Sequence, residues 1–119
     1  MPEPRRMANT TELATGETSG AIWKLEPEQR DLDANLISLA PGEEIGAHQG
    51  PELDVLLHVF AGSGTLHTAS GNIDLVIGDI IYLPARSQRH FIAGAEGLGY
   101  FSVHQRKKRT GLMPTLRSS

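Results

Sequence analysis

Residues 42–64 read GEEIGAHQGPELDVLLHVFAGSG, and this stretch decides the fold. Gly42 opens it, Gly62 closes it, and the Gly50-Pro51 pair interrupts it. Glycine supplies the positive φ angles, and proline the preset φ angle, that turns require. The apolar runs between these residues are therefore predicted to be short β-strands.

The alternation of short apolar runs and turn residues continues in both directions along the chain. From Ala21 onward, turn residues recur about every eight to twelve positions, a spacing typical of β-sandwiches and barrels. Helical patterns are nearly absent, so the predicted class is all-β. The predicted strands are residues 21–26, 35–40, 43–48, 54–61, 64–69, 72–77, 79–85, 89–93 and 99–106.

The predicted strands form one domain, residues 21–106, between two segments of different composition. Residues 1–20 are rich in Thr, Glu, Gly and Pro without apolar periodicity, so they form either a mobile arm or an addition to a sheet edge. Residues 107–119 continue a basic run and form a tail that is either solvated or packed on a neighbouring subunit.

The apolar pattern differs between strands. In residues 72–77, Ile73, Leu75 and Ile77 alternate with other residues, which predicts a half-buried strand. The runs DVLLHVF, from residue 54, and DIIYLP, from residue 79, are nearly continuous and predict burial on both faces. A closed or two-layer barrel accounts for both patterns.

Composition excludes several classes of function. The net charge of -3 argues against nucleic acid, which is bound through a surplus of Lys and Arg. Without Cys, any metal ligands would have to be His, carboxylate or water. The first 20 residues lack the apolar core of a secretory signal, and no run approaches the roughly 20 apolar residues of a membrane helix. We expect a cytoplasmic protein with a small-molecule ligand and no membrane partner.

Two stretches resemble the motifs of the cupin family. Gly42, His48 and Gly62 match the first motif, G-x5-H-x-H-x3-4-E-x6-G. Gly78 and Pro84 match the start of the second, G-x5-P-x-G-x2-H-x3-N. The resemblance covers most of the chain and implies a double-stranded β-helix, or jelly-roll, barrel. Because single-domain cupins pair, it also implies a homodimer.

In metal-binding cupins, two His and a Glu of the first motif and the His of the second hold one divalent ion. His48 occupies the first of these positions, whereas Gly50, Val55 and Arg89 occupy the others. A one-residue bulge would change which side chains face inward and could restore a site. Such a site for Fe, Mn, Ni or Zn would consist of His48, Asp54 or Glu52, His90 and His104.

The substitutions also favour a different ligand. Arg89 would project a permanent cation into the barrel, which suits a carboxylate or a phosphate. His104 shares a strand face with Tyr100 and Ser102, and this polar row would either line a pocket or face solvent. Alternatively, Arg86 and Arg89 are solvated at the rim. The predicted ligand site consists of His48, Arg89 and His104.

Three functions remain open. The first is a binding module for a small organic acid, without metal or turnover. The second is a metal-dependent dioxygenase or isomerase with a re-registered ligand set, and the third is a structural or regulatory subunit with a vestigial pocket. The fold cannot choose among them, because this scaffold hosts many chemistries. The substituted ligand positions favour the binding module.

Overall fold

The computed structural model describes residues 3–13 and 19–106. The regular secondary structure of this part of the chain is β-strand apart from one turn of 3-10 helix at Thr10–Glu12, so the all-β prediction is confirmed. The predicted tail lies outside the described residues, as do residues 1–2 and 14–18 of the arm. The strands are β1 (Gly20–Lys24), β2 (Leu32–Leu39), β3 (Glu44–Gln49), β4 (Val55–Thr68), β5 (Gly71–Val76), β6 (Ile80–Leu83) and β7 (Gln88–Gln105).

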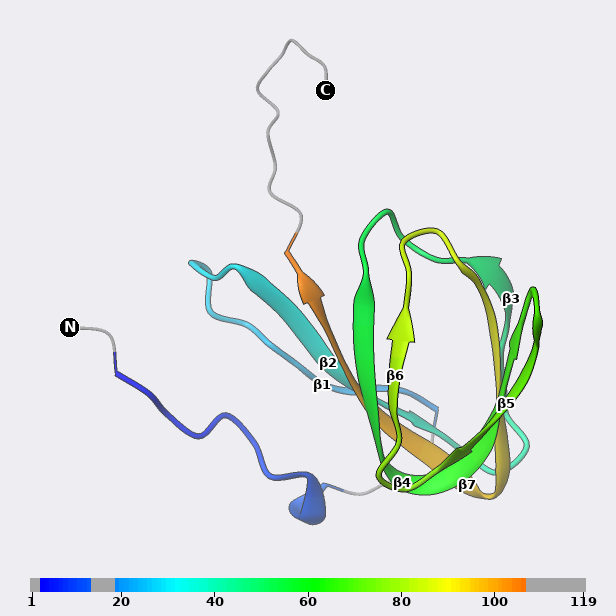
Figure 1. Ribbon diagram of the computed structural model, residues 1–119. Helices are drawn as coiled ribbons and strands as arrows, with labels where there is room; N and C mark the ends of the chain where they lie inside the picture. The colour runs from blue at the N-terminus through cyan, green and yellow to red at the C-terminus, as the bar shows by residue number, and fades with distance from the viewer. Residues whose placement is uncertain (1–2, 14–18, 107–119) are drawn as a thin grey trace, which may run out of the picture.

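Two long strands, β4 and β7, bend through the molecule and belong to both layers of the barrel (Figure 1). The first layer contains β1, β2, the second half of β7, the first half of β4, and β6. The second layer contains β3, the first half of β7, the second half of β4, and β5. All pairings are antiparallel, and together they form the predicted jelly roll.

At two places where the sequence predicted a break between strands, the structure has one continuous long strand. Residues 54–61 and 64–69 form one strand, because the chain passes through Gly62 with a bulge instead of reversing. Gly62 has φ of 69°, and a Cβ there would lie 2.7 Å from the carbonyl carbon of Gly97 on β7. Similarly, β7 continues through Gly94, in the break between the predicted strands 89–93 and 99–106. These glycines allow bends and close approach within paired strands.

The core lies between the two layers and is formed by the inward-facing side chains of β4, β7 and their neighbours. Leu57 and Val59 of β4 are almost fully buried, and the rings of Phe91 and Tyr100 stack with centroids 5.1 Å apart. The buried cluster comprises Leu39, Val55, Leu57, Val59, Leu66, Leu75, Leu83, Phe91, Ala93, Leu98 and Tyr100.

The prediction that the continuous apolar runs are buried on both faces is wrong for the single chain. Leu56 on β4 remains 48% exposed, and Ile80 and Tyr82 on β6 remain 71% and 58% exposed. On β5, Leu75 is buried, whereas Ile73 and the following Ile77 are exposed, because the barrel covers only the middle of this strand. No helix in the described ranges is long and apolar enough to cross a membrane.

Candidate functional site

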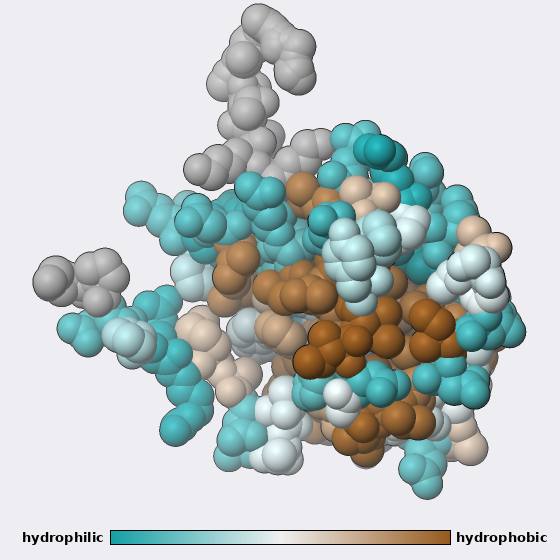
Figure 2. Space-filling model, in the orientation of Figure 1, coloured by the Kyte–Doolittle hydropathy of each residue, from teal (hydrophilic) through white to brown (hydrophobic). Residues whose placement is uncertain are grey.

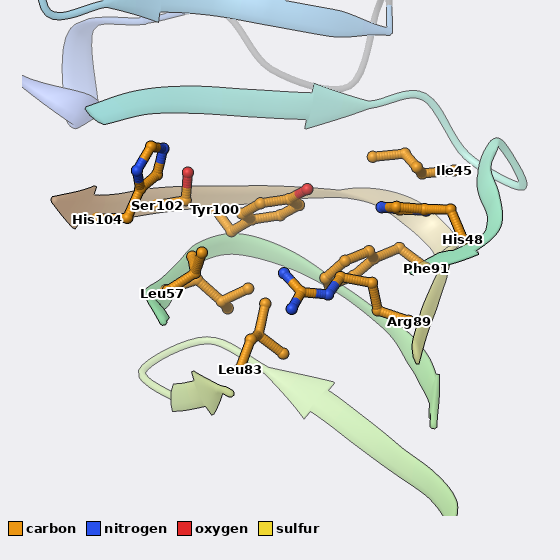
Figure 3. Close-up of a pocket in the computed structure, with 10 residues that line it drawn as sticks. Ile45, His48, Leu57, Leu83, Arg89, Phe91, Tyr100, Ser102 and His104 are labelled. Atoms are coloured by element: carbon orange, nitrogen blue, oxygen red, sulfur yellow. The ribbon is translucent and has the colours of Figure 1, made fainter. Parts of the chain in front are cut away.

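A cavity of about 160 Å³ lies between the layers at one end of the barrel (Figure 3). Most of its wall is apolar, and five side chains contribute ring nitrogens, hydroxyls or a guanidinium group. Figure 3 shows His48 at one end, Ser102 and His104 at the other, and Arg89 between them. The lining consists of Ile45, His48, Val55, Leu57, Leu83, Arg89, Phe91, Tyr100, Ser102 and His104.

Arg89 is the charged group inside this cavity. It is only 5% exposed, and it points inward from β7 beside its partner His48 on β3. Its Nε donates to the Ser87 carbonyl at 3.3 Å, and its Nη2 donates to the Pro84 carbonyl at 3.1 Å and to Ser87 Oγ at 2.7 Å. These three oxygen atoms hold the side chain in place, but none of them carries a negative charge.

The positive charge of Arg89 has no protein counter-ion in the described part of the chain. No carboxylate there lies within 4.0 Å of the guanidinium group, and Nη1 donates no hydrogen bond to a described residue. Burial lowers the pKa of Arg89, because the charged form loses hydration. The site therefore offers a desolvated cation with two free N–H donors.

Gly50 makes room for this guanidinium group. A Cβ at Gly50 would lie 2.6 Å from Arg89 Nε and would overlap the rest of the guanidinium group. The Gly50 amide donates to the Ser87 carbonyl at 2.9 Å, which fixes the backbone at this point. Two of the three substituted ligand positions, Gly50 and Arg89, therefore form one arrangement, in which the arginine fills space that any side chain at position 50 would need.

His48 and His104 both present Nε2 as the free ring nitrogen. His48 Nδ1 lies 2.8 Å from the Gly46 carbonyl, and His104 Nδ1 lies 2.8 Å from the Gln105 carbonyl. Because a carbonyl oxygen only accepts hydrogen bonds, Nδ1 carries the proton in both rings. In the neutral form, Nε2 is then an acceptor for a hydroxyl or amine of a ligand.

Tyr100 and Ser102 complete the polar part of the cavity. Burial raises the pKa of Tyr100 to about 12, so its hydroxyl remains protonated at neutral pH. Ser102 Oγ donates to Asn35 Oδ1 at 2.6 Å, which leaves its oxygen as an acceptor. The alternate positions of Tyr100, Ser102 and His104 predicted that these side chains share one face of a strand, and the structure places that face toward the cavity. The sequence did not identify the apolar wall, which is formed by core residues of several strands.

The structure does not bring His48, Asp54 and His90 together as a metal site. The His90 ring faces away from the cavity, with Nε2 2.7 Å from Glu44 Oε1. Asp54 instead accepts a hydrogen bond of 2.9 Å from the Ala85 amide. In residues 3–13 and 19–106, no three His, Asp or Glu side chains gather closely enough for a metal ion. The described residues therefore do not fit a divalent ion.

Arg86 and His67 also lie outside the cavity. Arg86 is exposed and has φ of 62°, so it belongs to the turn before β7. His67 packs against His90, with ring centroids 5.3 Å apart. A solvated position at the rim, the alternative for both arginines, therefore describes Arg86 but not Arg89, which is enclosed.

No protein-family model matches the sequence, and no curated protein matches it. Solved structures show the fold. A conserved protein of unknown function from Streptococcus pyogenes superposes with a TM-score of 0.68 at 20% identity, over 92% of this chain and 93% of that one. A cupin 2 conserved barrel protein from Rhodopseudomonas palustris superposes with a TM-score of 0.64 at 14% identity, over 71% of this chain.

A sugar phosphate isomerase of the cupin superfamily from Silicibacter pomeroyi superposes with a TM-score of 0.60 at 23% identity, over 67% of this chain. The chain spans 59% of the Rhodopseudomonas protein and 54% of the isomerase. At these identities, the likeness concerns the fold. The chain has the fold of a small cupin barrel.

Proposed function

We propose that this barrel is a binding module for a small organic anion, whose carboxylate pairs with Arg89. The observation that supports this function is the burial of Arg89 without a protein carboxylate. A buried cation without a counter-ion is costly, and an anionic ligand would offset that cost. The guanidinium group thus supplies the positive charge that a metal ion supplies in other cupins.

The other polar groups favour a ligand that also carries a hydroxyl. Nη1 of Arg89 would donate to the carboxylate, while Nε2 of His48 or His104 would accept from the hydroxyl. Leu57, Leu83 and Phe91 would contact the carbon skeleton. We therefore propose a small hydroxycarboxylate as the ligand.

The size of the cavity limits the ligand. A cavity of about 150 Å³ accommodates a molecule the size of benzene, and the cavity here measures about 160 Å³. A short hydroxy acid fits this space. The likeness to a sugar phosphate isomerase raises a sugar phosphate as a second candidate, but such a molecule would need a wider opening of the two layers.

Thermal unfolding of the full chain with lactate, propionate and glucose 6-phosphate tests this function. Lactate should stabilise most, because it carries both a carboxylate and a hydroxyl in a small molecule. At 100 times its dissociation constant, a ligand adds about 2.7 kcal/mol to the free energy of unfolding. Arg89→Met should abolish the shift, whereas Arg86→Met, which removes an arginine outside the cavity, should retain it. A lactate shift that persists in Arg89→Met would contradict the proposal, as would a lack of response to both carboxylates.

A further inference from the structure

A second cavity, an open groove of about 480 Å³, lies between β6 of the first layer and the β4–β5 hairpin of the second. Of the residues that line this groove, only Leu83 also lines the cavity around Arg89. Figure 2 shows apolar side chains gathered on the surface over β4 and β6. The groove is therefore a site of its own, bordered by an apolar strand.

The floor of the groove consists of inward-facing side chains that the chain leaves partly uncovered. On β5, Ile73 alternates with the buried Leu75 but is 39% exposed. On β6, Ile81 alternates with the buried Leu83 and is only partly buried. Ile73 and Ile81 both line the groove. An apolar group that covered them would be stabilised by removal of this surface from water.

The wall along β6 is the free edge of a strand. In the described ranges, β6 pairs with β4 alone, and in Figure 1 its other edge is turned toward β5. The Val59 amide donates to the Asp79 carbonyl at 2.9 Å, and the bonded positions of an antiparallel pair recur at every second residue. The backbone groups of Ile80 and Tyr82 therefore point away from β4, where no described residue bonds them.

The groove follows this free edge. Residues 81–83 line it consecutively, although successive side chains of a strand point to opposite faces, so the groove runs along the border between the two faces. Strand edges are normally protected by charged side chains or proline, but β6 reads IIYL and has neither. Such an edge is a template for a further strand.

The groove also offers one unpaired cation. Among the described residues that line it, only Arg86 is charged, and its side chain makes no hydrogen bond or ion pair with a described residue. Its backbone has a left-handed φ of 62°, held by donation of its amide to the Pro51 carbonyl at 2.7 Å. This conformation is costly for a residue with a Cβ and occurs preferentially at binding sites. A carboxylate would complement the charge of Arg86.

We propose that the groove binds an extended peptide segment of a partner protein, which adds as a strand to the free edge of β6. The main chain of the peptide would exchange hydrogen bonds with Ile80 and Tyr82, and a carboxylate of the peptide would pair with Arg86. An apolar side chain of the peptide would cover Ile73 and Ile81. A small molecule could pair with Arg86 but would leave the strand edge unpaired, so the observations favour a peptide.

Selection of random heptapeptides, displayed on phage, against the full chain tests this site. The enriched peptides should alternate apolar residues and carry Asp or Glu. Fluorescence polarisation with the synthetic peptides then measures affinity. Methylation of alternate peptide amides should weaken binding about tenfold or more, because it removes main-chain donors without changing the side chains. A loss of this size is expected only for strand addition.

Two pairs of variants locate the peptide on the protein. Arg86→Gln should weaken binding about tenfold, whereas Arg5→Gln, which changes another exposed arginine, should not. Ile73→Lys should also weaken binding, whereas Ile77→Lys should not, because Ile77 is exposed but does not line the groove. Circular dichroism checks the fold of each variant.

Four results would overturn the proposal. They are a failure to enrich any peptide, affinities that N-methylation or Arg86→Gln leaves unchanged, displacement of the peptides by lactate, and self-association of the chain that Ile73→Lys abolishes. The last result would mean that a second copy fills the groove. The proposed function fails separately, because it rests on lactate binding that depends on Arg89, and Arg86→Gln should leave that binding intact.

Discussion

Arg89 occupies the space that a side chain at Gly50 would need. Gly50 directly follows β3, and Arg89 lies on β7, which pairs with β3. Both residues contact Ser87: the Gly50 amide donates to its carbonyl, and Arg89 donates to its carbonyl and hydroxyl. A Cβ at position 50 would lie 2.6 Å from Arg89 Nε. The guanidinium group of Arg89 can therefore take this position only because residue 50 has no side chain.

Gly50→Ala should weaken binding of a small carboxylate by about tenfold or more, because the new methyl group displaces the guanidinium group. The fold should persist, since the displaced atoms belong to the end of a flexible side chain. Gly46→Ala is the control, because a Cβ there meets nothing within 4 Å. Calorimetric titration with lactate measures both variants, and equal affinities would contradict the prediction.

Arg89→Met should leave the unliganded protein as stable as the wild type or about 1 kcal/mol more stable. Methionine retains much of the apolar packing and removes a desolvated charge without a counter-ion. Urea unfolding without added anions measures the change. A loss of several kcal/mol would indicate that the hydrogen bonds of Arg89 to Pro84 and Ser87 stabilise the barrel more than its charge destabilises it.

The stability of the protein should fall above about pH 10 because of Tyr100. Burial raises its pKa in the folded state to about 12, above the ordinary value of 10.0. The protonated hydroxyl is therefore favoured by folding, and this contribution is fully present below pH 10 and is lost as pH rises toward 12. A shift of this size corresponds to on the order of 3 kcal/mol.

Tyr100→Phe isolates this contribution, because the ring that stacks on Phe91 is retained. Urea unfolding between pH 9 and pH 12, at about half-unit steps, should show a smaller loss in the variant than in the wild type. Identical pH profiles would show that other groups cause the alkaline loss.

Gly62→Ala should destabilise the barrel more than Gly42→Ala does. Both glycines have similar positive φ angles, 69° and 77°, so both variants carry a backbone cost of roughly 1–2 kcal/mol. Only at Gly62 would the Cβ also press on the Gly97 backbone. This contact should add roughly 1–3 kcal/mol. Denaturant unfolding of the two variants measures the difference. Equal losses in the free energy of unfolding would show that the backbone of β7 shifts to make room for the new Cβ.

Purified protein exposed to iron, manganese, nickel and zinc should retain no stoichiometric metal, because Gly50 and Arg89 replace two of the ligands and His90 points away. Elemental analysis of wild type and His48→Ala measures this. Near-stoichiometric metal that is lost in His48→Ala would restore the metal-dependent enzyme as the better hypothesis.

The turn residues and apolar runs were sufficient to predict the β-class and most of the strands, and the resemblance to the cupin motifs implied the jelly roll. The predicted breaks at Gly62 and Gly94 were wrong, because glycine also occurs where paired strands bend or approach closely. The continuous runs in β4 and β6 predicted burial that one chain does not provide. Their outer residues are covered only if another surface packs on them.

For the site, the sequence by itself determined which chemical groups are available: an arginine and two histidines, and a glycine where metal-binding cupins have a ligand. Periodicity and turn chemistry are local properties, so they can be read along the chain. Only the tertiary structure decided that Arg89 points inward, that His90 points outward and that Gly50 leaves space for the guanidinium group. These outcomes depend on strand register and bulges, and a one-residue shift moves every side chain to the opposite face.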